Sequence, residues 1–326
     1  EDDQSHLTCV FGRLYSDAGR KAAHSISMQA SQLRRIAKTK QAIETRFQDD
    51  VLPELRKQVA AWRSNGTTVG LVPTMGSLHE GHLSLIKAAL GQTDRVITTI
   101  FVNPTQFNDK KDLEKYPRNE AADVALLEPL DVAIVWAPHV EEMYADGFAT
   151  TVSVSGITDG LCGATRPGHF DGVATVVSKL LLQALPDAAY FGQKDYQQLA
   201  VINRLVADLN IPAKIVGCPI LREVDGLAMS SRNVRLSEKG RKTAALLFQT
   251  LSQAAEDIDS GKSVETVMSR SSEALLAAGF EAIDYLEMRS ADDLSPMTEF
   301  DRPARLFVAA FLDGVRLIDN VVVKGR

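Results

Sequence analysis

Apolar residues follow two alternating patterns between residues 67 and 218, and together they predict an α/β fold. Short apolar runs predict buried strands, at Thr67–Val72, Arg95–Val102, Val132–Trp136, Ala188–Phe191 and Ala213–Cys218. Stretches with apolar residues every three or four positions predict helices between them, at Leu83–Leu90, Glu120–Leu127, Asp171–Leu185 and Gln197–Leu209. Strands that alternate with helices are typical of a doubly wound, mostly parallel, Rossmann-like sheet.

A further helix is predicted before the first strand. Apolar residues recur every three or four positions from Ile43 to Trp62, and Asn65-Gly66 ends the pattern. We therefore expect the Rossmann-like domain to span residues 41–222. Residues 1–40 start with acidic side chains and then become basic and Ser-rich, so we expect a disordered extension, with a targeting or contact role as the alternative.

The last hundred residues predict a smaller α+β domain over residues 223–326. Helices are expected at Glu238–Ser260 and Val264–Ala278, followed by strands at Ile283–Met288, Ala304–Leu312 and Val315–Ile318. The last two strands flank Asp313-Gly314, a dipeptide typical of a two-residue hairpin turn. We expect this domain to close over a site in the first one.

Composition narrows the function classes. The net charge is −6 and no basic tract dominates, which argues against a nucleic-acid partner. The three cysteines (Cys9, Cys162 and Cys218) lie far apart in the sequence, so a reduced, cytoplasmic protein without a zinc site is expected. The apolar runs are shorter than the roughly 18 residues that a membrane span requires, so no membrane contact is expected.

The segment from Pro73 to His82 joins the first strand to its helix and carries the strongest chemical pattern. Ligands of doubly wound sheets bind at the carboxyl ends of strands. Gly76 and Gly81 permit close approach of the backbone to a ligand, and the helix start attracts phosphate. His79 and His82 can donate hydrogen bonds to phosphate oxygens. The alternative is a metal pair or two structurally satisfied histidines.

Polar groups also follow other strands. Asn103 and Gln106 come after the second strand and suit a hydroxylated acid, although a capped turn would look the same. Gly192 and Lys194 follow the fourth strand, and the lysine could contact a phosphate in transfer or merely pair with Asp195 at the surface.

Two further segments can contact anions. Arg166-Pro167-Gly168-His169 precedes the helix through Leu185, and it could bind an anion or only begin that helix. Met229-Ser230-Ser231-Arg232 combines two hydroxyls with a guanidinium, a weak pattern alone that suits phosphate oxygens.

These segments together resemble one family. The string Pro-Thr-Met-Gly-x-Leu-His-x-Gly-His resembles the His-x-Gly-His signature of the nucleotidylyltransferase superfamily, and in its longer form the pantothenate synthetase (pantoate–β-alanine ligase) family. The segments at residues 101–107, 166–173, 191–198 and 221–233, with Tyr116-Pro117-Arg118 and Arg316–Asn320, match that family in order. The resemblance spans residues 43–326.

The resemblance implies an ATP-dependent condensation of (R)-pantoate with β-alanine to pantothenate, AMP and pyrophosphate, through a pantoyl-adenylate. It also implies Mg²⁺ accompanying ATP without nominated protein ligands, since Asp123 and Asp195 have equally good structural explanations, and a homodimer. The catalytic residues implied are His79, His82, Lys194, Ser230, Ser231 and Arg232. ATP-binding residues would be Met75, Gly76, Ser77, Leu78, His79, Glu80, Gly81, His82, Gly192, Gln193, Lys194, Asp195, Leu221, Met229, Ser230, Ser231 and Arg232. Gln106 and Gln198 would bind pantoate, and Gln106 also β-alanine.

The chain departs from the family pattern at Thr105, where Met is common, and at Gln193, where Glu is common. Three alternatives remain open. They are nucleotidyl transfer to another acceptor, such as a phosphorylated alcohol, a synthetase-like fragment, and a nucleotide-binding module without catalysis. The uncharged Gln106 and Gln198 argue against a phosphorylated acceptor, which would attract cationic side chains.

Overall fold

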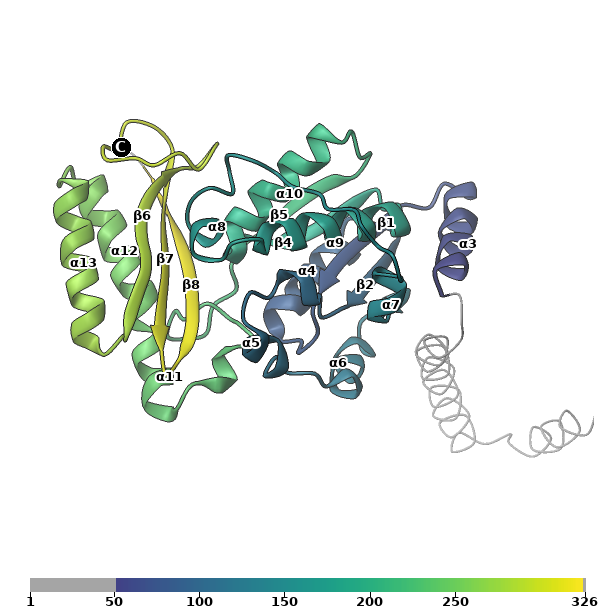
Figure 1. Ribbon diagram of the computed structural model, residues 1–326, viewed down its shortest axis with the longest axis horizontal. Helices are drawn as coiled ribbons and strands as arrows, with labels where there is room; N and C mark the ends of the chain where they lie inside the picture. Colours follow the sequence, from purple (N-terminus) through teal and green to yellow (C-terminus); the bar gives the residue numbers. More distant parts are fainter. Residues whose placement is uncertain (1–50, 325–326) are drawn as a thin grey trace, which may run out of the picture.

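The computed structural model describes residues 51–324, arranged around two separate sheets (Figure 1). The predicted extension over residues 1–40 and the start of the predicted first helix lie outside the described residues. The described part of that helix is α3, Val51–Ser64. Within residues 51–324 none of the helices combines the length and the apolar character needed to cross a bilayer.

The larger sheet confirms the predicted doubly wound class. Its five parallel strands lie in the order β3-β2-β1-β4-β5. They are β1 Val69–Thr74, β2 Arg95–Ile100, β3 Ile134–Trp136, β4 Ala188–Gly192 and β5 Lys214–Cys218. β1 ends later than predicted and includes Pro73. Proline is tolerated there because β4 pairs with β1 only at Gly70 and Leu71, so no ladder partner is lost.

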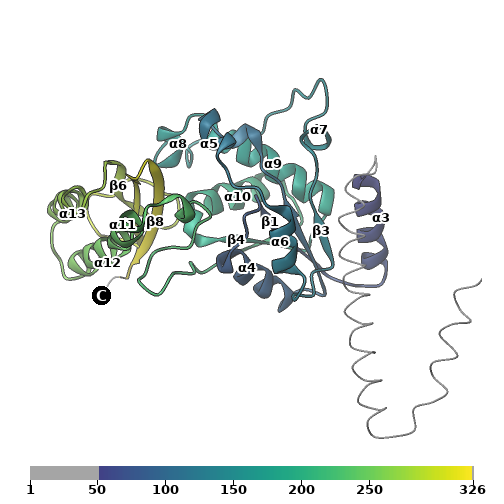
Figure 2. The same ribbon diagram turned by 90° about the horizontal axis from the view of Figure 1, so that it is seen from below.

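Helices cover both faces of this sheet (Figure 2). On one face lie α3, α9 (His169–Ala184) and α10 (Tyr196–Asp208), whose apolar residues share one core with β1 and β4. On the other face lie α4 (Glu80–Leu90) and α6 (Glu120–Leu127), which close a second core. Shorter helical turns connect these elements: η3 Pro104–Gln106, α5 Lys110–Glu114, α7 Val140–Met143, α8 Cys162–Thr165, η4 Gln193–Asp195 and η5 Asn233–Arg235.

The smaller sheet is antiparallel, in the order β6-β7-β8. Its strands are β6 Ala282–Ser290, β7 Ala304–Leu312 and β8 Val315–Val323, and α12 (Leu246–Asp259) and α13 (Val264–Ala278) pack beside it. The helix predicted over Glu238–Ser260 is divided at one residue. α11 (Glu238–Ala244) ends and α12 begins at Ala245, whose φ of −60° and ψ of −27° remain in the right-handed helical region. The domain boundary near residue 222 stays a prediction.

β8 is longer than the predicted Val315–Ile318. It pairs with β7 along its whole length, from Val315 opposite Leu312 to Val323 opposite Ala304. The sequence pattern broke at Asp319 and Asn320, which are polar yet only 3% and 1% exposed. Their polar groups are hydrogen-bonded to Arg222, to backbone carbonyls after β4 and to Arg305 of β7, so they continue the strand.

A glycine in α9 sets how closely this helix approaches the loop after β2. A Cβ at Gly172 would lie 2.5 Å from the carbonyl oxygen of Thr105. Gly172→Ala should therefore lower the free energy of unfolding by ~1–3 kcal/mol, the usual range for overpacking, although alanine is the better helix former. Urea denaturation of the variant and the unaltered chain measures this difference in the free energy of unfolding.

Gly91→Ala is the matched control, because the nearest atom to its Cβ would be 3.5 Å away. Gly91→Ala should change stability by less than ~0.5 kcal/mol. Equal stability of the Gly172→Ala variant and the unaltered chain would show that α9 and the loop can move apart freely.

Candidate active site

The loop between β1 and α4 is held in an unusual backbone conformation by one buried carboxylate. Gly76 and Ser77 have φ values of 75° and 50°, in the left-handed region that disfavours serine. The Asp123 carboxylate from α6 accepts hydrogen bonds from the Ser77 N–H at 2.9 Å and the Leu78 N–H at 2.6 Å. These two bonds offset the strain and fix the direction in which α4 starts.

His79 and His82 point into the pocket from the start of α4. His79 caps the helix, and its Nδ1 accepts from the Gly81 N–H at 3.1 Å. His82 Nδ1 faces the His79 N–H at 3.4 Å, and the ring centroids are 4.1 Å apart. Because Nδ1 of each ring faces a backbone donor, Nε2 carries the hydrogen in the neutral form.

Both imidazoles are held neutral at physiological pH. Burial, followed by the positive charge of Lys194, lowers the pKa of His79 to about 4. Burial and the neighbouring His79 ring lower the pKa of His82 to about 3. Each ring therefore presents an N–H donor without carrying a charge.

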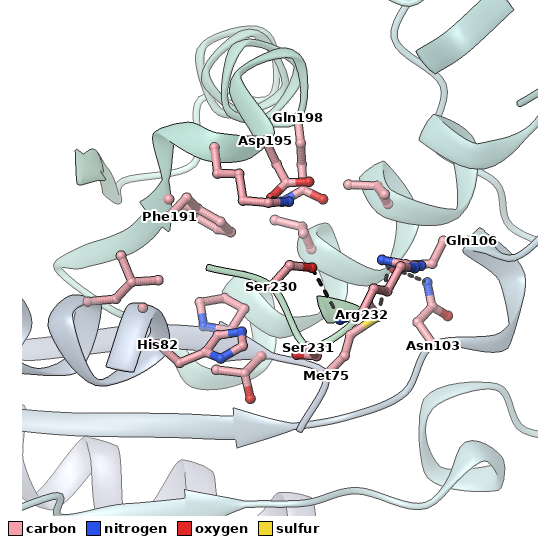
Figure 3. Close-up of a pocket in the computed structure, with 18 of the residues that line it drawn as sticks. Met75, His82, Asn103, Gln106, Phe191, Asp195, Gln198, Ser230, Ser231 and Arg232 are labelled. Atoms are coloured by element: carbon pink, nitrogen blue, oxygen red, sulfur yellow. Dashed lines mark hydrogen bonds and ion pairs between the residues drawn. The ribbon is translucent and has the colours of Figure 1, made fainter. Parts of the chain in front are cut away.

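The opposite wall comes from the segment after β4. Lys194 lies in η4 with a largely buried side chain, and its Nζ is 3.7 Å from an Asp195 carboxylate oxygen. Gln198 follows on the first turn of α10, and Figure 3 shows it beside Asp195 across the pocket from His82. A cationic group thus faces two neutral donors across one cavity.

A third side is formed by the loop after β2. Asn103 donates to the Gln106 side-chain oxygen at 3.0 Å, and the Gln106 Nε2 contacts the Met75 sulfur at 3.1 Å (Figure 3). Thr105, the residue that departs from the family pattern, does not line the cavity. Its hydroxyl donates to the Asn103 Oδ1 at 2.9 Å, so it helps to orient this amide.

The Gln106 backbone is fixed by Arg166 and His169, for which the sequence predicted either an anion contact or only the start of a helix. The His169 Nδ1 donates to the Gln106 carbonyl oxygen at 2.8 Å, and the Arg166 guanidinium donates to the same atom at 3.1 Å. The guanidinium also lies 3.2 Å from the His169 Nε2. Burial and the Arg166 charge lower the pKa of His169 to about 4. Both residues line the cavity and position Gln106.

The segment Met229–Arg232 also lines the pocket, and Figure 3 shows Ser230, Ser231 and Arg232 beside Met75. The Ser231 hydroxyl donates to the Ser77 carbonyl oxygen at 3.0 Å, which docks this loop on the β1–α4 loop. The Arg232 guanidinium pairs with Asp112 at 3.0 Å, as Arg235 does at 2.8 Å. The sequence did not predict this role of Asp112, because an acidic residue on a short polar helix is ordinary.

Most of the predicted site residues line this one cavity: Met75, His79, Gly81, His82, Gln106, Gly192, Lys194, Asp195, Gln198, Leu221, Met229, Ser230, Ser231 and Arg232. Gly76, Ser77, Leu78, Glu80 and Gln193 do not line it. Glu80 pairs with Lys87 at the surface, and the Gln193 side chain donates to the Gly217 carbonyl at 3.5 Å. Sequence reasoning missed the apolar wall of α9, formed by Val173, Val176, Val177 and Leu180.

The acidic groups argue against a metal cage made by the protein. In residues 51–324 no group of three or more His, Cys, Asp or Glu side chains is placed to hold a metal ion. The Asp123 oxygens are occupied by backbone donors, and Asp195 is the carboxylate that lines the cavity among the described residues. This donor set fits a cation that arrives on a phosphate ligand with its own water shell.

Comparison with known proteins places the chain in a family. The family model described as pantoate-beta-alanine ligase matches residues 50–322. A pantothenate synthetase from Chelativorans is 58% identical over 270 residues, covering 83% of this chain and 95% of that protein. One from Cereibacter sphaeroides is also 58% identical, covering 83% of this chain and 97% of its own length.

Solved structures of the same family resemble the fold of this chain. The crystal structure of pantothenate synthetase from Thermus thermophilus has 46% identity and a TM-score of 0.77, covering 81% of this chain and 97% of that one. A Francisella tularensis pantoate-beta-alanine ligase, described as complexed with beta-gamma ATP and beta-alanine, has 35% identity and a TM-score of 0.71, covering 82% and 95%. The fold, the convergent pocket and these relatives together show that the chain belongs to the pantoate-beta-alanine ligase family.

Proposed function

We propose that this single pocket carries out both steps of the ligase reaction, the ATP-dependent condensation of (R)-pantoate with β-alanine to pantothenate, AMP and pyrophosphate. The observation that carries the proposal is convergence. Phosphate-binding groups from three segments (His79 and His82, Lys194, and Ser230–Arg232) surround the same cavity as Gln106 and Gln198. The complex described for the Francisella relative, with an ATP compound and beta-alanine, supports it.

The first step activates the acid. A pantoate carboxylate oxygen attacks the α-phosphorus of ATP, a bond from that oxygen to phosphorus forms, and the bond to the β-phosphate oxygen breaks as pyrophosphate leaves. Gln106 and Gln198 offer amide donors and acceptors that hold pantoate in line for this attack. Such positioning supplies a large share of the rate enhancement, and no covalent enzyme intermediate is required.

Charge that develops on the phosphate oxygens is met by preorganised groups. Lys194 supplies a compact positive charge, while His79 and His82 supply Nε2–H donors without a competing positive charge of their own. We assign Ser230, Ser231 and Arg232 to the leaving phosphates. In the resting structure Arg232 pairs with Asp112, so phosphate would compete with this carboxylate for the guanidinium.

The second step forms the amide. The neutral β-alanine amine attacks the acyl carbon of pantoyl-adenylate, and the C–N bond forms. The bond between the acyl carbon and the AMP oxygen breaks, so AMP departs with the former carboxylate oxygen, and the nitrogen loses one proton to solvent. Gln106 lies where it can contact both acids, because its amide faces the cavity from between Asn103 and Met75. Residues 221–232 lie in the segment that connects the two sheets, so movement of the smaller domain would carry Ser230–Arg232 over the phosphates.

The activity is consistent with a divalent cation, and we propose Mg²⁺ delivered as Mg-ATP. Asp195, which lines the cavity, would accept hydrogen bonds from water bound to the cation, and the phosphates would supply the direct ligands. A homodimer, a cytoplasmic location and the boundary between residues 222 and 223 stay predictions. Sedimentation velocity of the purified chain tests the dimer.

Isotope exchange between pyrophosphate and ATP tests the proposed sequence of steps. With Mg-ATP and pantoate, exchange should proceed without β-alanine, and pantothenate should form only after the amine is added. Exchange that does not depend on pantoate but requires a different acceptor would support nucleotidyl transfer to that acceptor. ATP binding by folded protein without any exchange would support a binding module.

His82→Ala should slow adenylate formation by ~100-fold or more, the loss typical of one charge-stabilising donor. Single-turnover pyrophosphate release measures this rate. His139→Ala, at an exposed histidine before α7 that lines no cavity described here, is the matched control and should retain the full rate. A His82→Ala variant as fast as the control would remove this histidine from the mechanism.

The depressed pKa of His82 should appear in the pH dependence of stability. Between pH ~6.5 and ~4 the unfolded imidazole takes up a proton that the folded ring does not, so the free energy of unfolding falls as pH falls. His82→Gln should reduce this slope by up to ~1.4 kcal/mol per pH unit, the equivalent of one proton. Urea titrations at several pH values measure it, and an unchanged slope would mean that the folded His82 titrates normally.

A further inference from the structure

Strand β8 carries a buried amide that reaches across to the loop that holds Lys194. Asn320 is 1% exposed, although β8 is an edge strand of the smaller sheet, where Asn320 lies opposite Phe307 of β7. Buried polar side chains are retained in folded proteins when they are fully hydrogen-bonded. The partners of Asn320 therefore indicate what it does.

Both N–H donors and the oxygen of the Asn320 side-chain amide are hydrogen-bonded, which uses three of the four bonds that an amide can make. Its Nδ2 donates to the Gln193 carbonyl oxygen at 2.9 Å and to the Lys194 carbonyl oxygen at 3.0 Å. Its Oδ1 accepts from the Arg305 guanidinium on β7. The orientation of the amide is thus unambiguous, because one end faces two carbonyls and the other faces a cation.

The two carbonyls belong to the short turn η4, which carries Lys194 into the pocket. A turn of this length has few internal hydrogen bonds, so its orientation depends on external partners. The Lys194 side chain faces the histidines from this turn, and its ammonium lowers the pKa of both. Asn320 therefore holds the backbone atoms from which the Lys194 side chain extends.

The base of Asn320 is itself rigid. The preceding Asp319 receives two hydrogen bonds from the Arg222 guanidinium, at 2.6 and 2.9 Å, and Arg222 stacks 3.7 Å from the Phe248 ring centroid. Arg222 also bridges to Ala228, at the foot of the Ser230–Arg232 segment. A side chain can position a neighbouring loop precisely only if its own backbone is held in place, and these contacts hold the backbone of Asn320.

We propose that Asn320 is a positioning residue for the adenylation step, which acts by fixing the backbone of Gln193 and Lys194 so that the Lys194 ammonium meets the phosphate. The inference rests on the proposed role of Lys194. The competing explanation is that Asn320 only joins the two domains and contributes stability.

The test compares Asn320→Ala and Asn320→Asp with the unaltered chain. The aspartate keeps the size and the Arg305 contact but loses both donors and sets a carboxylate against two carbonyls. Both variants should slow pantoate-dependent pyrophosphate–ATP exchange by ~10- to 100-fold, the penalty expected for a misplacement near 1 Å. The KM for β-alanine in the overall reaction should change by less than ~2-fold. A general loss of structure would instead weaken the binding of every substrate.

Val308→Ala is the matched control for stability. Val308 is fully buried in the smaller domain's core, opposite Asp319, and lies in no cavity described here. Its truncation should lower the melting temperature at least as much as the Asn320 variants while it leaves the exchange rate intact. Slowing of exchange in proportion to lost stability across all three variants would overturn the inference.

A double-mutant cycle separates the inference from its premise. In a Lys194→Ala background, Asn320→Ala should slow single-turnover adenylation by less than ~3-fold, because the group it positions is gone. The same loss in both backgrounds would overturn the inference and leave the role of Lys194 standing. A Lys194→Ala variant with normal adenylation would overturn both.

Discussion

The site depends on the two hydrogen bonds that Asp123 accepts from the β1–α4 loop. They hold Ser77 at a φ of 50°, and this conformation sets the start of α4, where His79 and His82 present neutral N–H donors. The same loop offers the Ser77 carbonyl oxygen to Ser231. One buried carboxylate therefore fixes both the two histidines that line the pocket and the point where the Met229–Arg232 segment docks.

Much of this arrangement could be predicted from the sequence. The order of strands and helices and the parallel sheet follow from apolar periodicity, because buried parallel strands leave uninterrupted apolar runs. The convergence of His79, Gln106 and Lys194 follows from their places after the first, second and fourth strands, whose carboxyl ends share one edge of the sheet. The ligands proposed for them came from resemblance, since residue types alone left several acceptors open.

Other features had no local signal. The roles of Asp112 and Asn320 depend on side chains far away in sequence, such as Arg232 and Arg305, and no periodicity reports such pairs. β8 was predicted too short because Asp319 and Asn320 interrupt its apolar pattern; tertiary partners override the pattern there. Conversely, Gln193 and Glu80 match binding positions in sequence, yet their side chains lie outside the cavity.

Oxygen transfer tests most directly whether the pocket directs the pantoate carboxylate to the α-phosphorus. Pantoate labelled with ¹⁸O in its carboxylate, Mg-ATP and β-alanine would be turned over by the unaltered chain, and the products analysed by mass spectrometry. The account predicts AMP that carries one ¹⁸O and pyrophosphate that carries none. Unlabelled AMP, or label in phosphate released with ADP, would contradict it, because activation would then proceed without an adenylate.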